Sequence, residues 1–248
     1  MAALSTVSAW IVDAAVRRTG VSITLVLVWT CIALGIVVVA VFAWYAARRR
    51  RATMEERARS LGFTRVPNDP TLVARFAAYG DPFDLGHHRR VTNVLVGTRH
   101  GRPAIAADYS YKTRGGRKGS TTHHLGVVGI RTGLWLPSLS VLPEAVISQP
   151  TDTLLDNDVI VENREFNRTF TVTSAEPETA GDVLDPAMTE FLLFHPHEGL
   201  KVNGAELVRV VPGHLRPEHL QPALDYLDAV LERIPERARR NLRASDQG

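Results

Sequence analysis

The chain has 248 residues, of which 45% are hydrophobic, 22% charged and 7% aromatic. This ordinary globular composition excludes intrinsic disorder of the chain as a whole, and the length predicts one or two domains. The single cysteine, Cys31, excludes an intrachain disulfide and a multi-cysteine zinc site. A formal net charge of +3 is too small for a dedicated nucleic-acid-binding protein, so we expect no nucleic-acid partner.

The N-terminal segment, residues 1–20, has the pattern of a small amphipathic helix. Its apolar residues, among them Leu4, Val7 and Trp10, recur at helical spacing. Residues 2–16 are too short and too polar to cross a membrane. We expect this segment outside the cytoplasm, lying flat on the membrane surface or docking a partner subunit.

Residues 21–47 form an uncharged and almost wholly apolar run. About 20 helical residues cross a hydrocarbon core of about 30 Å, so the run predicts one transmembrane helix. The apolar region of a cleaved signal peptide is about 7–15 residues long. Because this run is far longer and ends in arginines, we interpret it as an uncleaved anchor.

The end of the apolar run carries the residues expected at a membrane interface. Aromatic residues favour that region, and the side with more lysine and arginine is cytoplasmic. The arginines after the run outnumber Arg17 and Arg18 before it, which predicts a single-pass plasma-membrane protein with its N-terminus outside. The arginine tract is either a stop signal for membrane insertion or a contact for anionic lipid. The predicted interface residues are Trp44, Tyr45, Arg48, Arg49, Arg50 and Arg51.

The region 52–235 is predicted to be a cytoplasmic domain that begins with two helical segments and a hairpin. Thr53 and Glu56 fit the cap of a short helix that stops at Gly62. A helical patch follows near 72–79, and strand-like patterns over 91–98 and 103–112 predict a hairpin.

More strands are expected in the middle of this region. The pattern predicts a third strand over 121–131 and a fourth over 134–142, which Pro137 makes an edge or bulged strand. Residues 159–173 are expected to be β-structure with Phe166 and Phe170 on the apolar face. Arg168 would then also face the apolar side, where it would need Asp182 or Asp185 as a partner.

The last elements are two helices and a turn. Asp185 with proline after it predicts the start of a helix over 185–194. Asn203 and Gly204 form the strongest short hairpin signal in the chain. An amphipathic helix follows over 217–233, and residues 236–248 form a basic tail.

These elements predict an α+β fold: one N-terminal transmembrane helix, then an antiparallel β-rich domain with flanking helices. About seven strands with one terminal helix are similar to the pleckstrin-homology-like roll.

No catalytic or metal-binding motif is found. The adjacent pairs His87–His88 and His123–His124 point to opposite faces of a strand, so neither can chelate one ion. The glycine-rich loop near Gly115 lacks the residue order of a phosphate-binding loop. We therefore predict no catalytic, cofactor-binding or metal-binding residues and no cofactor. The loop instead forms a basic hairpin tip, which could contact a partner or lipid through Lys112, Arg114, Arg117 and Lys118.

The order of motifs resembles a family of uncharacterised single-pass bacterial membrane proteins, common in actinobacteria. The span and arginine cluster are followed by LGFTRVP, PFDLGHHRRVTNVLVG, ADYSY, EFNRTFTV and LERIP, and EFNRTF is the most specific of these. The resemblance covers nearly the whole chain. It implies a membrane-anchored domain of unknown function and transfers no catalytic residues.

We therefore expect a non-enzymatic accessory or scaffold subunit of a larger membrane protein assembly. It would bind protein partners through its transmembrane helix and its cytoplasmic domain, with the lipid bilayer as its environment. The alternative is a lipid or ligand sensor at the cytoplasmic face. An unrecognised hydrolase is the third interpretation.

Overall fold

The computed structural model describes residues 23–114, 119–144, 146, 159–236 and 239. The chain divides into two compact units, Met1–Arg51 and Ala52–Gly248. The predicted N-terminal segment 1–20 lies outside the described residues, as does most of the tail 236–248. The elements in chain order are α2 (Ile23–Ser60), β1 (Thr64–Arg65), α3 (Thr71–Ala77), β2 (His87–Arg99), β3 (Arg102–Arg114), β4 (Ser120–Pro143), α4 (Arg164–Thr169), β5 (Phe170–Ser174), α5 (Pro177–Val183), α6 (Pro186–Leu193), β6 (Gly199–Pro212), η1 (Pro217–His219) and α7 (Leu220–Arg233).

Helix α2 is longer than the apolar run that begins it. It continues through the arginines to Ser60, so Thr53 lies inside a helix and does not cap a separate one, as we had expected. The helix ends at Ser60, just before the expected stop at Gly62, whose φ of +79° suits a residue without Cβ. In the second unit, Met54 and Ala58 of this helix are buried in the core.

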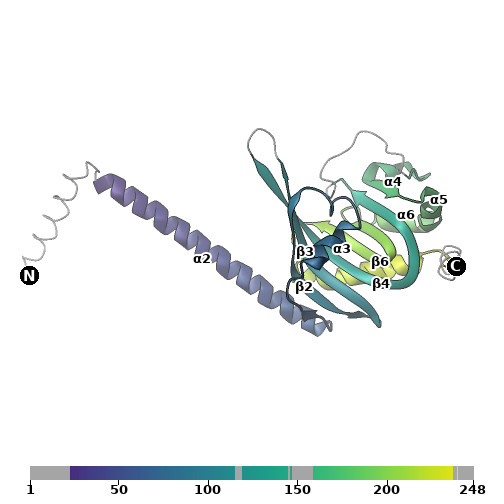
Figure 1. Ribbon diagram of the computed structural model, residues 1–248, viewed down its shortest axis with the longest axis horizontal. Helices are drawn as coiled ribbons and strands as arrows, with labels where there is room; N and C mark the ends of the chain where they lie inside the picture. Colours follow the sequence, from purple (N-terminus) through teal and green to yellow (C-terminus); the bar gives the residue numbers. More distant parts are fainter. Residues whose placement is uncertain (1–22, 115–118, 145, 147–158, 237–238, 240–248) are drawn as a thin grey trace, which may run out of the picture. The chain divides into compact units, whose positions relative to one another are not determined.

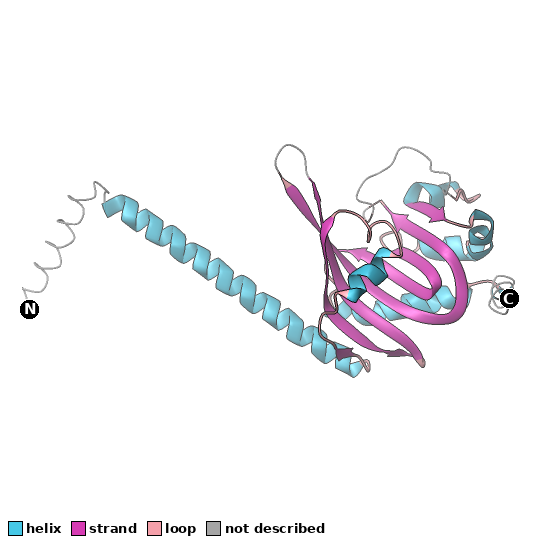
Figure 2. Cartoon of the chain, viewed as in Figure 1, coloured by secondary structure: helices cyan, strands magenta, loops and turns pink. Residues whose placement is uncertain are grey.

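The second unit is built on one antiparallel sheet. Its strands follow the order β1-β2-β3-β4-β5, and β6 pairs with the other edge of β4 (Figure 2). The hairpin of β2 and β3 turns at His100 and Gly101, whose φ values of +49° and +76° are those of a tight primed turn. The predicted α+β class, with an apolar N-terminal helix and flanking helices, is confirmed.

Strand β4 unites two strands that we had predicted to be separate. Thr132 and Gly133 form no turn: the Thr132 hydroxyl bonds to the backbone N and O of Leu134 and keeps the chain in the sheet. The pairing with β6 shifts register on both sides of Leu136. Of the two roles that Pro137 allowed, the structure therefore shows the bulged strand.

The hairpin predicted at Asn203 and Gly204 is wrong, because both residues lie inside the continuous strand β6. Gly204 pairs with Leu136 at the register shift and has a φ of +57°. A Cβ on Gly204 would lie 3.2 Å from the Trp135 ring. The glycine therefore permits a bulge and the close approach of an aromatic ring, where the sequence pattern indicated a reversal of the chain.

The segment 159–173 is also not a continuous β run, because α4 precedes β5. Asn163 caps this short helix by accepting hydrogen bonds from the backbone N–H groups of Glu165 and Phe166. Phe166 of α4 and Phe170, the first residue of β5, meet with ring centroids 5.0 Å apart. Arg168, two residues after Phe166, is exposed on the other side, contrary to our expectation.

One face of the sheet packs against helices. Helix α7 crosses it, and α4, α5 and α6 gather beside β5 (Figure 1). The predicted stripe on α7 is confirmed, and the predicted cap of α6 is confirmed by a 2.9 Å hydrogen bond from the Met188 N–H to the Asp185 carboxylate. The buried residues of α7 are Leu220, Ala223, Leu224, Tyr226, Leu227, Val230 and Leu231.

The opposite face of the sheet is covered over only part of its area. Helix α3 and the chain after it place Phe76 and Phe83 against Tyr109 of β3. The Phe83 and Tyr109 rings lie 4.9 Å apart, and the Tyr109 hydroxyl donates to the Phe83 carbonyl over 2.5 Å. Beyond α3, the side chains of the strands line an open pocket.

Candidate functional site

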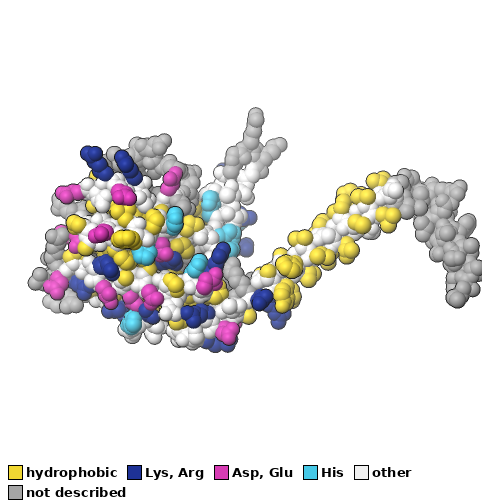
Figure 3. Space-filling model, turned by 180° about the vertical axis from the view of Figure 1, so that it is seen from behind, with side chains coloured by type: hydrophobic (Ala, Val, Ile, Leu, Met, Phe, Trp, Pro, Cys, Tyr) yellow, Lys and Arg dark blue, Asp and Glu magenta, His cyan; other side chains and the backbone are white. Residues whose placement is uncertain are grey.

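The first functional feature is the exposed apolar part of α2. Every side chain from Thr24 to Arg49 is exposed, and the apolar ones dominate the surface in Figure 3. Within the described residues, α2 alone is long and apolar enough to span a membrane. Apolar side chains on all sides of a helix need an apolar surrounding, which indicates membrane anchoring.

The predicted interface residues lie on one continuous stretch of α2. Trp44 and Tyr45 are exposed by 61% and 59%, and the Arg48 guanidinium lies 5.4 Å from the centre of the Trp44 ring. Arg49 is also exposed. The backbones of Arg50 and Arg51 are helical, and their side chains lie outside the described residues. That these residues contact lipid stays a prediction.

The predicted basic hairpin tip is described only in part. Lys112 is partly exposed and Arg114 is exposed on β3. Arg117 and Lys118 lie outside the described residues. The partner or lipid contact of this tip also stays a prediction.

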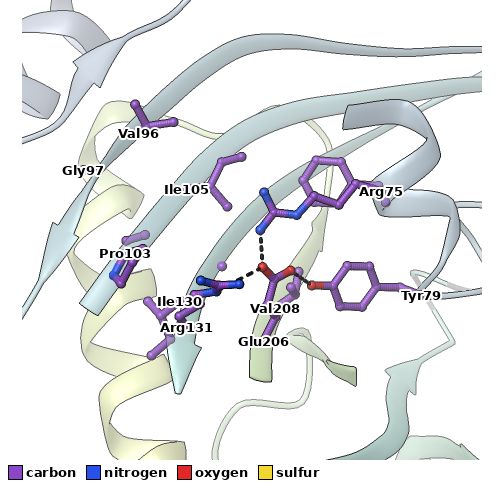
Figure 4. Close-up of a pocket in the computed structure, with 13 residues that line it drawn as sticks. Arg75, Tyr79, Val96, Gly97, Pro103, Ile105, Ile130, Arg131, Glu206 and Val208 are labelled. Carbon is purple, nitrogen blue, oxygen red and sulfur yellow. Dashed lines mark hydrogen bonds and ion pairs between the residues drawn. The ribbon is translucent and has the colours of Figure 1, made fainter. Parts of the chain in front are cut away.

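The second feature is the pocket beside α3, of about 470 Å³ (Figure 4). Ligand pockets in proteins usually measure about 300–1,000 Å³. The floor is apolar and is formed by Ile105 and Val208, with Gly129 between them. A Cβ on Gly129 would lie 3.3 Å from a methyl group of each neighbour, so the missing side chain deepens the floor. Val96 and Pro103 form one wall.

The polar wall of the pocket is organised around Glu206 of β6. Its carboxylate forms an ion pair with Arg75 of α3, lies 4.0 Å from Nε of Arg131 and accepts a 2.5 Å hydrogen bond from the Tyr79 hydroxyl. Burial, followed by the bond to this carboxylate, raises the pKa of Tyr79 well above its usual value, so the phenol stays a donor. One carboxylate therefore faces two guanidinium groups at the pocket.

A buried lysine supports this wall from behind. Lys201 of β6 is 2% exposed, and its ammonium donates a 2.7 Å hydrogen bond to the Tyr79 carbonyl. Burial lowers the pKa of Lys201 to about 8, although Asp81 and Asp84 oppose this shift. Burial also raises the pKa of Asp81. Because Tyr79 is held at both its carbonyl and its hydroxyl, the polar wall is fixed to β6 at two points.

The histidines lie in separate places. His123 stacks on Tyr111 with ring centroids 4.8 Å apart, whereas His124 lies 4.4 Å from the His214 ring. Nδ1 of His214 lies 3.3 Å from the buried Asp108 carboxylate, which also accepts a 2.8 Å hydrogen bond from the backbone N–H of Leu215. This contact fixes the chain between β6 and α7. Among the described residues, no three metal-ligating side chains are grouped.

Reasoning from sequence did not identify the pocket. Arg75 and Tyr79 are four residues apart in the predicted helical patch, the one local sign that they share a face. Nothing in the sequence pattern joins them to Arg131 and Glu206, which are more than fifty residues away in the chain. Only the pairing of β4 with β6, which sets Arg131 opposite Glu206, and the position of α3 bring them together.

Comparisons with known proteins add the fold and little else. No protein-family model matches the chain, and no curated protein matches it. The fold is similar to the crystal structure of the mycobacterial trehalose monomycolate transport factor A, with a TM-score of 0.53 and 14% identity over 75% of this chain and 95% of that chain. At this identity the likeness shows a shared fold. The resemblance to uncharacterised single-pass bacterial membrane proteins stays a prediction.

Proposed function

We propose that the protein is a non-enzymatic accessory subunit of a larger assembly in the plasma membrane. Its transmembrane helix and its folded domain would each contact protein partners. The observation that carries this proposal is the exposure of the apolar side chains over residues 24–49 of α2. Such a helix fixes the domain at a membrane and leaves one side free to pack against another helix.

The likeness to a transport factor supports the same proposal. The name of that protein describes a factor that takes part in transport, and its domain has the fold seen here. A domain of this fold that an apolar helix anchors at a membrane suits an auxiliary protein of a transport process. We therefore propose an accessory role in a membrane transport assembly.

The charge distribution supports an orientation with the N-terminus outside and the domain in the cytoplasm. Four arginines, residues 48–51, follow the apolar run directly. Cysteine labelling tests this in a chain with Cys31 replaced by alanine. A membrane-impermeant maleimide added to intact cells should label Ser5→Cys and leave Thr98→Cys, on β2, unlabelled until the cells are opened. Labelling of Thr98→Cys in intact cells would reverse the orientation.

The assembly itself is tested with the full chain in a mild detergent. We expect a discrete complex larger than one chain in a micelle. In a matched variant, leucines replace residues 24–43, which keeps Trp44 and the arginines; this helix should still insert but lose the complex. If the unaltered protein elutes alone as a monomer, the accessory role is wrong.

The second candidate function, a lipid or ligand sensor, is favoured by a different observation, the pocket at α3. The pocket combines an apolar floor with two arginines, which is a usual composition for a ligand site. The sensor role does not require a partner helix, so the detergent experiment above does not decide it.

A further inference from the structure

We propose that the pocket beside α3 binds a small amphipathic anion, with a phosphate or carboxylate head at Arg75 and Arg131 and a short apolar body on the floor. This inference develops the sensor candidate and is independent of the accessory role. It rests on the distribution of unused hydrogen-bond donors, on the apolar floor and on the fixed polar wall.

The charge balance of the polar wall favours an anion. Two guanidinium groups face a single carboxylate, so the wall has a net positive charge. Both oxygens of Glu206 already accept contacts, from Tyr79 on one and from the two arginines on the other. Glu206 is therefore a poor acceptor for a ligand.

The arginines, unlike Glu206, still have hydrogen-bonding groups available for a ligand. Each guanidinium has five N–H donors, and the contacts with Glu206 involve one nitrogen of Arg75 and one of Arg131. The side chains are exposed by 48% and 63%, which keeps the remaining donors accessible at the pocket mouth. A planar group with several donors suits the oxygens of a phosphate or carboxylate.

The floor selects an anion with an apolar body over a free inorganic anion. Ile105 and Val208 flank the space that Gly129 leaves open, and Val96, 38% exposed, forms the wall. Binding is favoured when a ligand covers exposed apolar surface of this kind, because that surface is removed from water. A volume of about 470 Å³ admits a short alkyl chain or a ring, together with its head group.

The site is formed before a ligand arrives. Tyr79 is held by Glu206 at its hydroxyl and by Lys201 at its carbonyl, and Arg75 is held by the same carboxylate. Figure 4 shows Arg75, Arg131 and Tyr79 converging on Glu206 from α3, β4 and the chain after α3. Few side chains of the site would have to be ordered when a ligand binds, so the entropy cost of binding is small.

The test uses the full chain in phosphatidylcholine nanodiscs, with empty nanodiscs subtracted. Four probes are titrated by calorimetry: hexyl phosphate, hexanoate, inorganic phosphate and hexanol. We expect hexyl phosphate or hexanoate to bind once per chain, at least about tenfold more tightly than inorganic phosphate or hexanol, because only these two fill both parts of the site. The two amphiphiles identify which head group is preferred. The proposal would be overturned if inorganic phosphate bound as tightly as the two amphiphiles, or if no probe bound above empty nanodiscs.

Variants locate the site. Arg131→Gln should weaken binding about tenfold, because a charged hydrogen bond is lost from an exposed side chain. Val96→Trp should abolish binding by filling the pocket, and Arg168→Gln, an exposed arginine on α4, is the matched control. Circular dichroism shows whether each variant is folded; if Val96→Trp does not fold, Arg131→Gln decides. Unchanged binding in Arg131→Gln would place the ligand elsewhere and refute the proposal. The detergent complex should persist in Arg131→Gln, which separates this test from the accessory role.

Discussion

The buried Lys201 makes the stability of the domain depend on pH in a direction that can be stated beforehand. Its pKa in the folded domain is about 8, against about 10.5 for an exposed lysine. Between these two values the unfolded chain binds the proton and the folded domain does not. Because stability rises with pH wherever the unfolded state binds more protons, the domain should become more stable from pH 8 to pH 10.5.

The magnitude follows from the size of the pKa difference. One pH unit of pKa corresponds to about 1.4 kcal/mol, so the charged ammonium lowers the free energy of unfolding by roughly 3 kcal/mol below pH 8. The hydrogen bond from Nζ to the Tyr79 carbonyl partly offsets this at neutral pH. For that reason the change with pH is a sharper test than the stability at a single pH.

The assay compares the unaltered chain with Lys201→Met by chemical denaturation in detergent at pH 7.5 and pH 10. Methionine has a similar length and fills the same space without a charge. Relative to Lys201→Met, the unaltered chain should gain roughly 2–3 kcal/mol over this interval, while other titrating groups cancel in the comparison. If the two proteins change in parallel, the ammonium is already stabilised in the fold and our reasoning about burial is wrong.

Three further predictions concern the core, a helix cap and the bulge, and each is measured by denaturation of the full chain. Leu227→Ala should lower the free energy of unfolding by about 2–5 kcal/mol, because this side chain of α7 is fully buried; a loss below 1 kcal/mol would contradict the assigned core. Asp185→Ala should cost about 1 kcal/mol by removing the acceptor for Met188, and Asp185→Asn, which keeps an acceptor, should cost less. Gly204→Val should destabilise by more than about 1 kcal/mol, because a β-branched residue at a φ of +57° is strained and would press on Trp135; a neutral result would show that the bulge is not required.

The sequence by itself determined the features that depend on local pattern. The uncharged run 21–47 is long enough to span a membrane whatever it packs against, and the α7 stripe repeats every three to four residues. The cap at Asp185 and the hairpin of β2 and β3 are likewise determined by residues that are neighbours in the sequence. For these features the energy comes from contacts within a few positions or from the solvent, so no knowledge of the distant chain is needed.

The tertiary structure alone decided the places where a local signal was ambiguous. Gly204 allows a positive φ in a turn or in a bulge, and only the partner strand β4 selects the bulge. The pattern around Phe166 fits a strand or a helix, and the packing of α4 selects a helix that ends before Phe170 and leaves Arg168 exposed. The pocket depends on contacts between α3 and strands far along the chain, and no local free energy encodes which distant side chains will meet there.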